Sequence, residues 1–513
     1  MAIIGIDLGT TNSVVAFTDK NGITQTIAGR DGGRIVPSVI YFPENADIVV
    51  GERARSMSVI EPSRVASLFK RGMGSPTFLA DGSEFIVDAK AWRPEELSSL
   101  VLKKLKLMAE EFLGESVTDA VVTVPAYFGD PERAATRDAA RIAGLNPIKI
   151  LNEPTAAAIA HGFDSEASGK NLLVFDLGGG TFDVTVMRIS NENEMEVLAT
   201  GGDRRLGGAD FDIVIVSLMI KFAKTSAGVD LQSEPWMKQD ALEKAEEMKK
   251  ELSVAEISTR SLSTGGRPLA FTLSRIELEA ALESFLTDVS DTVELTLRDS
   301  GLTAADIDVA LMVGGSSRIP AFQNVLSQVL GKQPIFTKNL DEDVARGAAI
   351  LATKLSGTAD ARSELAQLTI PQDIASHGLG ITALEVKPDG SRIRYNSVLI
   401  PAGTQIPAER EEIYVTADPD QSSISIELNE GSEEDLTFVR NLGKGSAEFG
   451  RPVRQGYPIR VIIQYTADQV VQLRALDGET GVVLGEMKVQ REGALSEEDK
   501  LAALTAIGKL GVE

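Results

Sequence analysis

The fold is decided by two matching stretches of sequence, IIGIDLGTTNSVVAF at residues 3–17 and LLVFDLGGGTFDVTV at residues 172–186. Each has an apolar run, then Asp-Leu-Gly, a few small residues and a second apolar run. Small residues between two apolar runs are typical of a β-hairpin, and a repeat of this kind indicates two equivalent structural units. The sequence therefore predicts two equivalent hairpins in one fold.

Each hairpin carries an aspartate, Asp7 or Asp176, at the end of its first strand. The glycine that follows lets backbone N–H groups approach phosphate oxygens without interference from a side chain. One Asp-Leu-Gly alone is usually a structural turn, but two in matching strands favour a phosphate site. The residues predicted to surround the phosphates are Gly9, Thr10, Thr11, Asn12, Gly178, Gly179, Gly180 and Thr181.

The residue types available limit the chemistry of such a site. The chain has no cysteine and only two histidines, His161 and His377. A divalent metal would therefore be held by carboxylates, water and phosphate, as magnesium is with ATP. Phosphoryl transfer also needs a positive charge at the γ-phosphate, for which Lys70 is the candidate. A lone lysine is more often a solvated surface charge. The candidate acids are Asp7, Glu153, Asp176 and Asp183.

Two further stretches are candidates for contact with a nucleoside. DVALMVGGSSRIP (308–320) is typical of a strand, a Gly-Gly turn and a helix, which would leave a flat backbone surface for a base or simply make a tight turn. A helix is predicted over residues 236–253. Its apolar stripe is Ala241, Ala245, Met248 and Leu252, and its polar face is Glu246, Lys249, Lys250 and Ser253.

The pattern of apolar and polar residues changes along the chain. About the first 355 residues alternate apolar runs with helical patterns, which indicates α/β layering. A polar segment follows, and residues 373 to about 492 then give short alternating runs broken by turns, as in a β-sandwich. The predicted parts are a nucleotide-binding domain (1–357), a linker (358–373), a β-sandwich domain (374–494) and a short C-terminal helix (495–513).

Composition excludes several classes of protein. The 513 residues carry a formal charge of −24, which disfavours a nonspecific nucleic-acid binder. The absence of cysteine rules out disulfides and thiolate zinc sites. The start of the sequence is not typical of a secretory signal, and the apolar runs are too short to cross a bilayer. We therefore expect a cytoplasmic protein that binds neither nucleic acid nor membrane.

Several separated motifs resemble the heat shock protein 70 (DnaK-like) chaperone family over nearly the whole chain. They are IDLGTTNS, VVTVPAYFGDPERAATRDAARIAGL, ILNEPTAAAIAHG, FDLGGGTFDVT, VGGSSRIP, DIASHGLGI and VTADPDQSSISIELNEGS. The resemblance implies an actin-like (ribonuclease H-like) two-lobed ATPase followed by an all-β peptide-binding sandwich. It also implies an ATP-dependent chaperone that controls the binding and release of extended apolar polypeptide segments.

The resemblance assigns roles around the nucleotide, with ATP or ADP, magnesium and potassium as cofactors. Lys70 matches a lysine that contacts the γ-phosphate and the attacking water, and Glu153 a carboxylate that senses the nucleotide. Thr181 matches a threonine near the γ-phosphate. Asp7, Asp176 and Asp183 match the acids that arrange the metals and water. The adenosine pocket would comprise Glu246, Lys249, Lys250, Ser253, Gly314, Gly315, Ser316, Arg318 and Asp341.

The resemblance also implies a relay and a peptide site. Pro125 and Arg133 match a switch pair, and Asp373 the end of the linker; without the resemblance, Pro125 would be a turn and Arg133 a solvated helix charge. Leu384 and Ala417 match the residues that arch over a bound peptide. The pocket beneath them would be lined by Ile381, Tyr414, Ile424 and Ile426, which are otherwise ordinary core residues.

The chain departs from the family pattern in four places. The linker AQLTIPQD lacks the usual leucines, Ala209 replaces a glutamate, the segment 71–95 is short, and a single short helix stands where the family has a helical lid. We therefore expect looser coupling and faster loss of peptide. Expected partners are unfolded polypeptides, a J-domain co-chaperone and a nucleotide exchange factor. The alternatives are a weakly hydrolysing, nucleotide-gated exchange-factor-like partner of another chaperone and, less favoured, a metabolite kinase.

Overall fold

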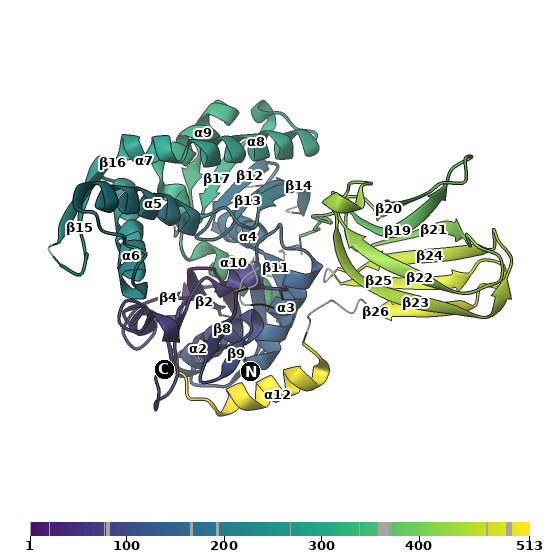
Figure 1. Cartoon of the computed structure of the whole chain (residues 1–513), viewed down its shortest axis with the longest axis horizontal. Coiled ribbons are helices and arrows are strands. Elements are labelled where there is room, and N and C mark those ends of the chain that lie inside the picture. The colour runs from purple at the N-terminus through teal and green to yellow at the C-terminus, as the bar shows by residue number, and fades with distance from the viewer. Residues whose placement is uncertain are drawn as a thin grey trace.

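The computed structural model describes residues 2–19, 21–75, 77, 83–164, 168–190, 194–266, 268–337, 339–357, 369, 371–467, 470–488 and 495–513. Most of the predicted linker, 358–368 and 370, lies outside the described residues, and so does part of the short segment 71–95. A mixed α/β part with several sheets is followed by an all-β part and a terminal helix (Figure 1). In the part of the chain that the structure describes, no helix is long and apolar enough to cross a membrane.

Two sheets in the α/β part repeat one strand order. The first sheet runs β3-β2-β1-β10-β11 and the second runs β14-β13-β12-β17-β18. In both, the central strand pairs antiparallel with its hairpin partner and parallel with the strand on its other side, so both predicted hairpins are present. The strands are β1 (Ala2–Leu8), β2 (Asn12–Thr18), β3 (Thr24–Thr26), β10 (Val117–Val124), β11 (Asn146–Asn152), β12 (Asn171–Leu177), β13 (Phe182–Ile189), β14 (Met195–Asp203), β17 (Val309–Val313) and β18 (Ile335–Phe336), with β4 (Ile35–Pro37) beside β2.

Helices α4 (Glu153–Asp164) and α10 (Asp343–Ser356) pack between the two sheets, where their alanines join apolar side chains of both sheets in one core. Helix α10 lies very close to the backbone of β1 and of α4. A Cβ on Gly5 would lie 2.1 Å from the Ala349 backbone nitrogen, and one on Gly347 would lie 1.8 Å from the Ala156 carbonyl oxygen. Glycine at these two positions therefore lets α10 lie directly against β1 and α4, which brings the two sheets close together.

The other faces of the two sheets are covered by separate groups of elements. Helices α2 (Pro94–Leu113) and α3 (Asp130–Ile142) cover the first sheet, with α1 (Glu52–Arg55) nearby. The small strands on that side are β5 (Ile40–Tyr41), β6 (Val49–Val50), β7 (Val65–Ala66), β8 (Phe85–Val87) and β9 (Lys90–Trp92). The second sheet carries α5 (Gly208–Ala227), α6 (Pro235–Leu252), β15 (Ile257–Leu262), β16 (Leu269–Ser274), α7 (Arg275–Ala281), α8 (Glu283–Asp299) and α9 (Pro320–Leu330).

The β-domain (residues 374–488) consists of two four-stranded antiparallel sheets around one apolar core. One sheet runs β20-β19-β22-β23 and the other β21-β24-β25-β26. The strands are β19 (Leu379–Val386), β20 (Arg392–Ile400), β21 (Ala408–Val415), β22 (Gln421–Glu430), β23 (Arg440–Val453), β24 (Pro458–Tyr465), β25 (Val471–Asp477) and β26 (Val483–Lys488).

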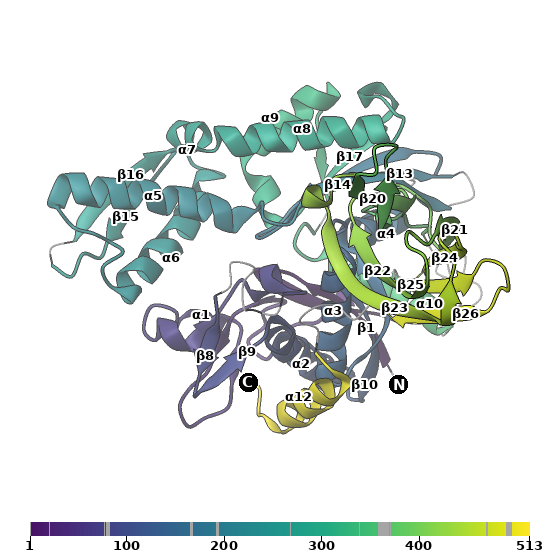
Figure 2. The same ribbon diagram turned by 45° about the vertical axis from the view of Figure 1, so that its right-hand side comes forward.

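The C-terminal segment (residues 495–513) lies away from the β-domain and packs against the first-sheet side of the molecule (Figures 1 and 2). Ser496 caps its helix, α12 (Glu497–Lys509), which lies against α3, and Ile507 is fully buried in the first-sheet core. Lys103 of α2 donates to the carbonyl oxygens of Ile507 at 2.7 Å and Leu510 at 2.8 Å. Val512 then forms a parallel bridge with Ile48. The chain thus leaves the α/β part, forms the β-domain, and returns to the same core.

Candidate functional site

The turns of the two hairpins, one from each central sheet, meet each other. A Cβ on Gly179 would lie 2.4 Å from the Thr11 side chain, and one on Gly180 would lie 2.4 Å from that of Thr10. Any larger residue would push the hairpins apart. The structure therefore brings the predicted phosphate residues of both hairpins together. These are Gly9, Thr10, Thr11 and Asn12 on one side and Gly178, Gly179, Gly180 and Thr181 on the other.

Four predicted acids form one cluster beside these turns, because Asp7, Asp176, Asp183 and Glu153 all interact electrostatically. Burial, followed by the charge of Glu153, raises the pKa of Asp7 and that of Asp183 to about 7. The same two causes raise the pKa of Asp176. Thr123 donates to Asp7 at 3.1 Å, whereas Asp183 Oδ2 is buried without a hydrogen-bond partner.

This cluster fits a divalent cation held largely through water and phosphate. Buried carboxylates that repel one another are stabilised by a positive charge between them, and magnesium usually keeps several waters. Among the described residues, no three His, Asp or Glu side chains are grouped so as to hold a metal directly. Asp7, Asp176 and Asp183 would therefore share the cation with the phosphates of a nucleotide.

Lys70 lies at the edge of the acid cluster and is only 2% exposed, so its alternative interpretation as a solvated surface charge is wrong. Its Nζ donates to Glu153 Oε1 at 2.8 Å and lies 5.5 Å from the centre of the Phe128 ring. It is held by the short 3-10 helix Phe69–Gly72, which Leu68 enters with a positive φ of 58°. The chain thus fixes one ammonium group beside the predicted γ-phosphate position.

The predicted adenosine residues lie on α6 and on the turn that follows β17. The apolar stripe of α6 is buried, and Lys249 is buried too, because its Nζ donates to the Gly208 carbonyl at 2.7 Å and to Asp212 at 2.8 Å. Ser316 lies close to Gly208, since a Cβ there would be 2.6 Å from Ser316 Oγ. Gly314 and Gly315 form the turn before Ser316. Arg318 of the same turn pairs with Asp341 at 2.6 Å. At the end of α6, Ser253 donates to the Lys249 carbonyl.

Sequence reasoning missed two ion pairs that connect the two sides of the α/β part. Glu246 of α6 accepts from Arg55, which follows β6, and also pairs with Lys250 at 2.7 Å. Burial opposes ionisation of Glu246, but the hydrogen bond from Lys250 and the charge of Arg55 outweigh it and lower its pKa to about 2. In the second pair, Arg71 donates to Asp210 at 3.0 Å. Both pairs join the first-sheet side to the second-sheet side.

The predicted switch residue Arg133 is 1% exposed, so its alternative interpretation as a solvated helix charge is wrong. Its guanidinium donates to the carbonyls of Phe128 at 2.8 Å and Ala126 at 3.1 Å, which follow Pro125 in one turn. It also donates to Asn152 Oδ1 at 2.6 Å. Sequence reasoning did not single out Asn152. Its position directly before Glu153 in the ILNEP motif is the signal that could have identified it.

The acid cluster is connected to the β-domain through one backbone segment. The Tyr127 N–H donates to Asp183 Oδ1 at 2.9 Å, and the Tyr127 carbonyl lies 3.1 Å from His377 Nε2. The two rings also meet edge to face, with centroids 4.4 Å apart. A nearby loop residue, Ser376, donates to the Ala126 carbonyl at 2.7 Å. A displacement of Asp183 would therefore reach His377 through a single residue.

The entry to the β-domain runs along the edge of the second sheet. Gln372 exchanges backbone hydrogen bonds with β14, donating to the Met195 carbonyl at 3.0 Å and accepting from the Val197 N–H at 3.1 Å. Ile374 is 2% exposed and lies in the core between the two sheets. The first residues of the β-domain are thus part of the packing of the α/β part.

The predicted peptide residues divide into core and rim. Ile381 and Ile426 are buried in the β-domain core, and Tyr414 and Ile424 pack against it half-buried. Leu384 is 40% exposed near the end of β19. Ala417 lies in the loop between β21 and β22.

Within the described β-domain, β19 and β22 pair only at Leu379–Ile381, so the remainder of each strand turns an unpaired edge toward the other. The loops at this end are joined by an ion pair of 2.6 Å between Arg392 and Asp418.

A comparison with known families returns one match that covers almost the whole chain. A sequence profile of the family described as "Hsp70 protein" matches residues 3–505 of the 513. The matched range includes both hairpins, the acid cluster, the β-domain and most of α12.

Proposed function

Because the chain belongs to the Hsp70 family, we propose that it binds and hydrolyses ATP in order to control the binding and release of extended apolar polypeptide segments. Members of this family are chaperones and ATPases that bind ATP or ADP with magnesium. The proposal includes an actin-like, two-lobed nucleotide-binding domain over residues 1–357, a linker to 373 and a peptide-binding sandwich over 374–494. The repeated strand order of the two central sheets supports it.

The observation that carries the proposal is a pair of contact chains, of which one joins the acid cluster to the β-domain and the other joins Arg133 to Asp373, directly before the β-domain. One runs from Asp183 through Tyr127 to His377, and the other from Arg133 through Asn152 to Asp373. Both chains are buried or half-buried, so their hydrogen bonds are costly to leave unmade. A nucleotide that shifts Asp183 or Arg133 would therefore act on the entry to the β-domain through these bonds.

In the proposed reaction, Lys70 donates to an oxygen of the γ-phosphate and orients the attacking water, while Glu153 holds the lysine in place. Asp7, Asp176 and Asp183 arrange magnesium and, as the resemblance implies, potassium. The cation supplies positive charge to the phosphate oxygens. The facing turns at Thr11 and Gly179 add backbone N–H and hydroxyl donors.

The separated edges of β19 and β22 support the peptide-binding part of the proposal. An extended peptide that enters this opening is able to hydrogen-bond to a free strand edge while one apolar side chain enters the pocket below. Leu384 and Ala417 would cover it, and Ile424 and Tyr414 would line the pocket. Family members generally bind unfolded polypeptides and co-chaperones, and we propose a J-domain protein, a nucleotide exchange factor and a cytoplasmic location for this chain.

Single-turnover ATP hydrolysis by the full chain, with and without an apolar heptapeptide and a J-domain protein, tests the proposal. We expect slow hydrolysis that both additions accelerate, and faster loss of a fluorescent peptide with ATP than with ADP. Hydrolysis indistinguishable from buffer would favour the nucleotide-gated partner instead.

The peptide site has a matched pair of variants. Ile424→Glu should weaken peptide binding at least tenfold, because it places a charge in the pocket. Ile413→Glu, at a residue 60% exposed on the other sheet, should leave peptide binding unchanged. Equal effects of the two substitutions would remove Ile424 from the pocket.

A further inference from the structure

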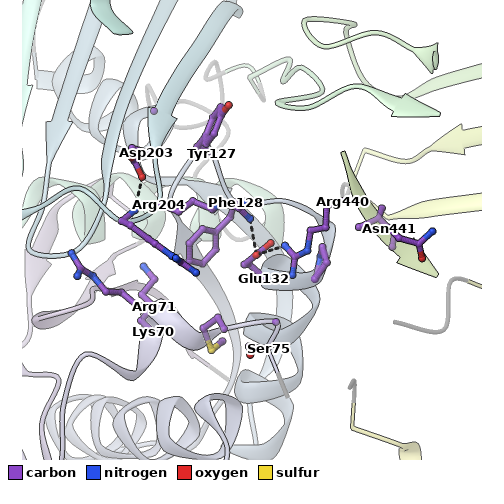
Figure 3. Close-up of a pocket in the computed structure, with 16 residues that line it drawn as sticks. Lys70, Arg71, Ser75, Tyr127, Phe128, Glu132, Asp203, Arg204, Arg440 and Asn441 are labelled. Atoms are coloured by element: carbon purple, nitrogen blue, oxygen red, sulfur yellow. Dashed lines mark hydrogen bonds and ion pairs between the residues drawn. The ribbon is translucent and has the colours of Figure 1, made fainter. Parts of the chain in front are cut away.

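A cavity of about 690 Å³ extends from Lys70 to the β-domain. Its walls come from the segment after Lys70, the turn and start of α3, the end of β14 and its following turn, and the start of β23. Figure 3 shows Lys70 and Arg71 on one side of Phe128, with Glu132 and Arg440 on the other. The cavity therefore begins at the predicted γ-phosphate position and ends where the two parts of the chain meet. Its size is sufficient for a small ligand with bound water.

The lining carries more positive than negative charge. Five of its residues are cations and two are carboxylates, and two further carboxylates pair with lining cations, Glu153 with Lys70 and Asp210 with Arg71, so a small positive excess remains in a chain whose formal charge is −24. The cations are Lys70, Arg71, Arg204, Arg205 and Arg440, and the carboxylates are Glu132 and Asp203. Cations gathered in a concave site concentrate the field and attract small anions. A water-filled gap between two acidic surfaces would not require these positively charged side chains.

Pairing within the cavity leaves part of the positive charge available. Arg204 and Arg440 share one carboxylate oxygen, Glu132 Oε1, at 2.8 and 2.5 Å. Burial disfavours ionisation of Glu132, but the charges of these two arginines outweigh it and lower its pKa, so a single negative charge faces two positive ones. Arg71 Nε is buried without a hydrogen-bond partner. Arg205 is exposed at the cavity wall.

We propose that this cavity binds inorganic phosphate, and that Arg440 makes its occupancy depend on docking of the β-domain. The source of the phosphate rests on the proposed function, because hydrolysis would release the anion next to Lys70. The binding itself rests only on the cavity and its guanidinium groups, which suit the oxygens of a phosphate.

Arg440 is the part of this site that the β-domain contributes. When the β-domain leaves, the cavity loses one cation and Glu132 loses one of its two partners, so the net positive charge at the site falls. By linkage, a ligand that binds the docked arrangement more tightly also stabilises docking by the same free energy. Phosphate held here would therefore delay departure of the β-domain until it dissociates.

The test measures binding of inorganic phosphate to the full chain by ³¹P NMR, with a nonhydrolysable ATP analogue bound so that the γ-phosphate position is already filled. We expect saturable binding that Arg205→Glu weakens at least fivefold. Arg298→Glu is the matched control, since it makes the same charge change at an exposed position of α8, and it should leave the affinity unchanged.

Loss of all phosphate binding in the analogue-loaded chain would mean that phosphate only competes for the γ-position, and this would overturn the proposal. An unchanged affinity in Arg205→Glu would overturn it as well. Neither measurement needs turnover, so a chain that binds phosphate here without hydrolysing ATP contradicts the proposed function alone.

Two variants on β23 test whether phosphate binding depends on docking of the β-domain. Arg440→Ala should weaken phosphate binding at least threefold, whereas Lys444→Ala, which removes an exposed charge from the same strand, should not change it. Equal affinities for wild type and Arg440→Ala would separate the phosphate site from docking and contradict that half of the proposal.

Discussion

Asn152 and Asp373 are 221 positions apart in the sequence, and the Asn152 side-chain amide donates to Asp373 Oδ2 at 2.7 Å. The other end of the same amide accepts from Arg133 at 2.6 Å. Asn152 also stands directly before Glu153, which holds Lys70. One amide therefore joins Asp373 to Arg133 directly before Glu153 of the acid cluster.

The first prediction concerns this amide. Asn152→Ala removes both hydrogen bonds but leaves Lys70 and Glu153 in place, so hydrolysis without peptide should stay within about twofold of wild type. The ratio of peptide release rates with ATP and with ADP should fall at least fivefold, because the linker no longer follows Arg133. Asn146→Ala, at an exposed position of the same strand where the side chain bonds to Asp119, is the control and should keep the ratio. A normal ratio in Asn152→Ala would show that coupling runs through Tyr127 and His377.

The second prediction concerns Lys70. Lys70→Ala should leave ATP binding largely intact but lower the single-turnover hydrolysis rate by roughly 10²–10³-fold, the usual loss when one fixed charge at a reacting phosphate or oxyanion is removed. Quenched-flow measurement of ADP formation checks the rate, and equilibrium titration checks binding. Lys221→Ala removes an exposed lysine of α5 as a control. An unchanged hydrolysis rate in Lys70→Ala would take this lysine out of its proposed role.

Local patterns predicted the centre of the fold well. The Asp-Leu-Gly repeat predicted both hairpins because a hairpin is built from neighbouring residues, and the apolar stripe of α6 is buried as its spacing predicts. The burial of Arg133 did not follow from its own helix pattern. A buried guanidinium needs carbonyl partners, and these come from a separate turn and from Asn152.

Local sequence patterns could not predict the contacts between segments that are far apart in the chain. The sequence predicts a short C-terminal helix but not which surface it packs against, and that surface proves to be α3 and the core of the first sheet. The pairing of Glu132 with Arg440 likewise depends on how the β-domain docks. The longest β-domain strand, β23, is rich in glycine and lacks clear alternation, so its pattern gave little signal.

The third prediction concerns the C-terminal segment. Ile507 is fully buried and Leu501, on the same helix, is 64% exposed. Ile507→Ala should lower the free energy of unfolding of the surrounding core by about 2–5 kcal/mol, because it leaves a cavity, whereas Leu501→Ala should change it by less than about 0.5 kcal/mol. Denaturant unfolding followed by fluorescence of Trp92, which belongs to the same core, measures both. Equal stabilities would mean that α12 is not part of this core in solution.

The fourth prediction concerns Glu95, in the first turn of α2. Glu95 is 4% exposed, and burial raises its pKa to about 7 although Arg93, 3.6 Å away, opposes the shift. The folded chain therefore holds this proton more tightly than the unfolded chain, in which the pKa of this carboxyl is near the ordinary value of 4.5. Between these two values the folded state binds more protons, so stability must fall as the pH rises from about 4.5 to about 7 and must then level off.

Glu95→Gln keeps the shape of this side chain and removes its charge, so it should abolish this part of the pH dependence. At pH 8 the variant should be more stable than wild type, and the loss of stability between pH 5 and pH 8 should shrink by about 2 kcal/mol. Glu294→Gln, at an exposed position of α8, should leave that difference within about 0.5 kcal/mol of wild type. Denaturant unfolding at the two pH values, again followed by Trp92, measures the change. If Glu95→Gln lost as much stability as wild type over this interval, burial of the carboxylate would not be its cause.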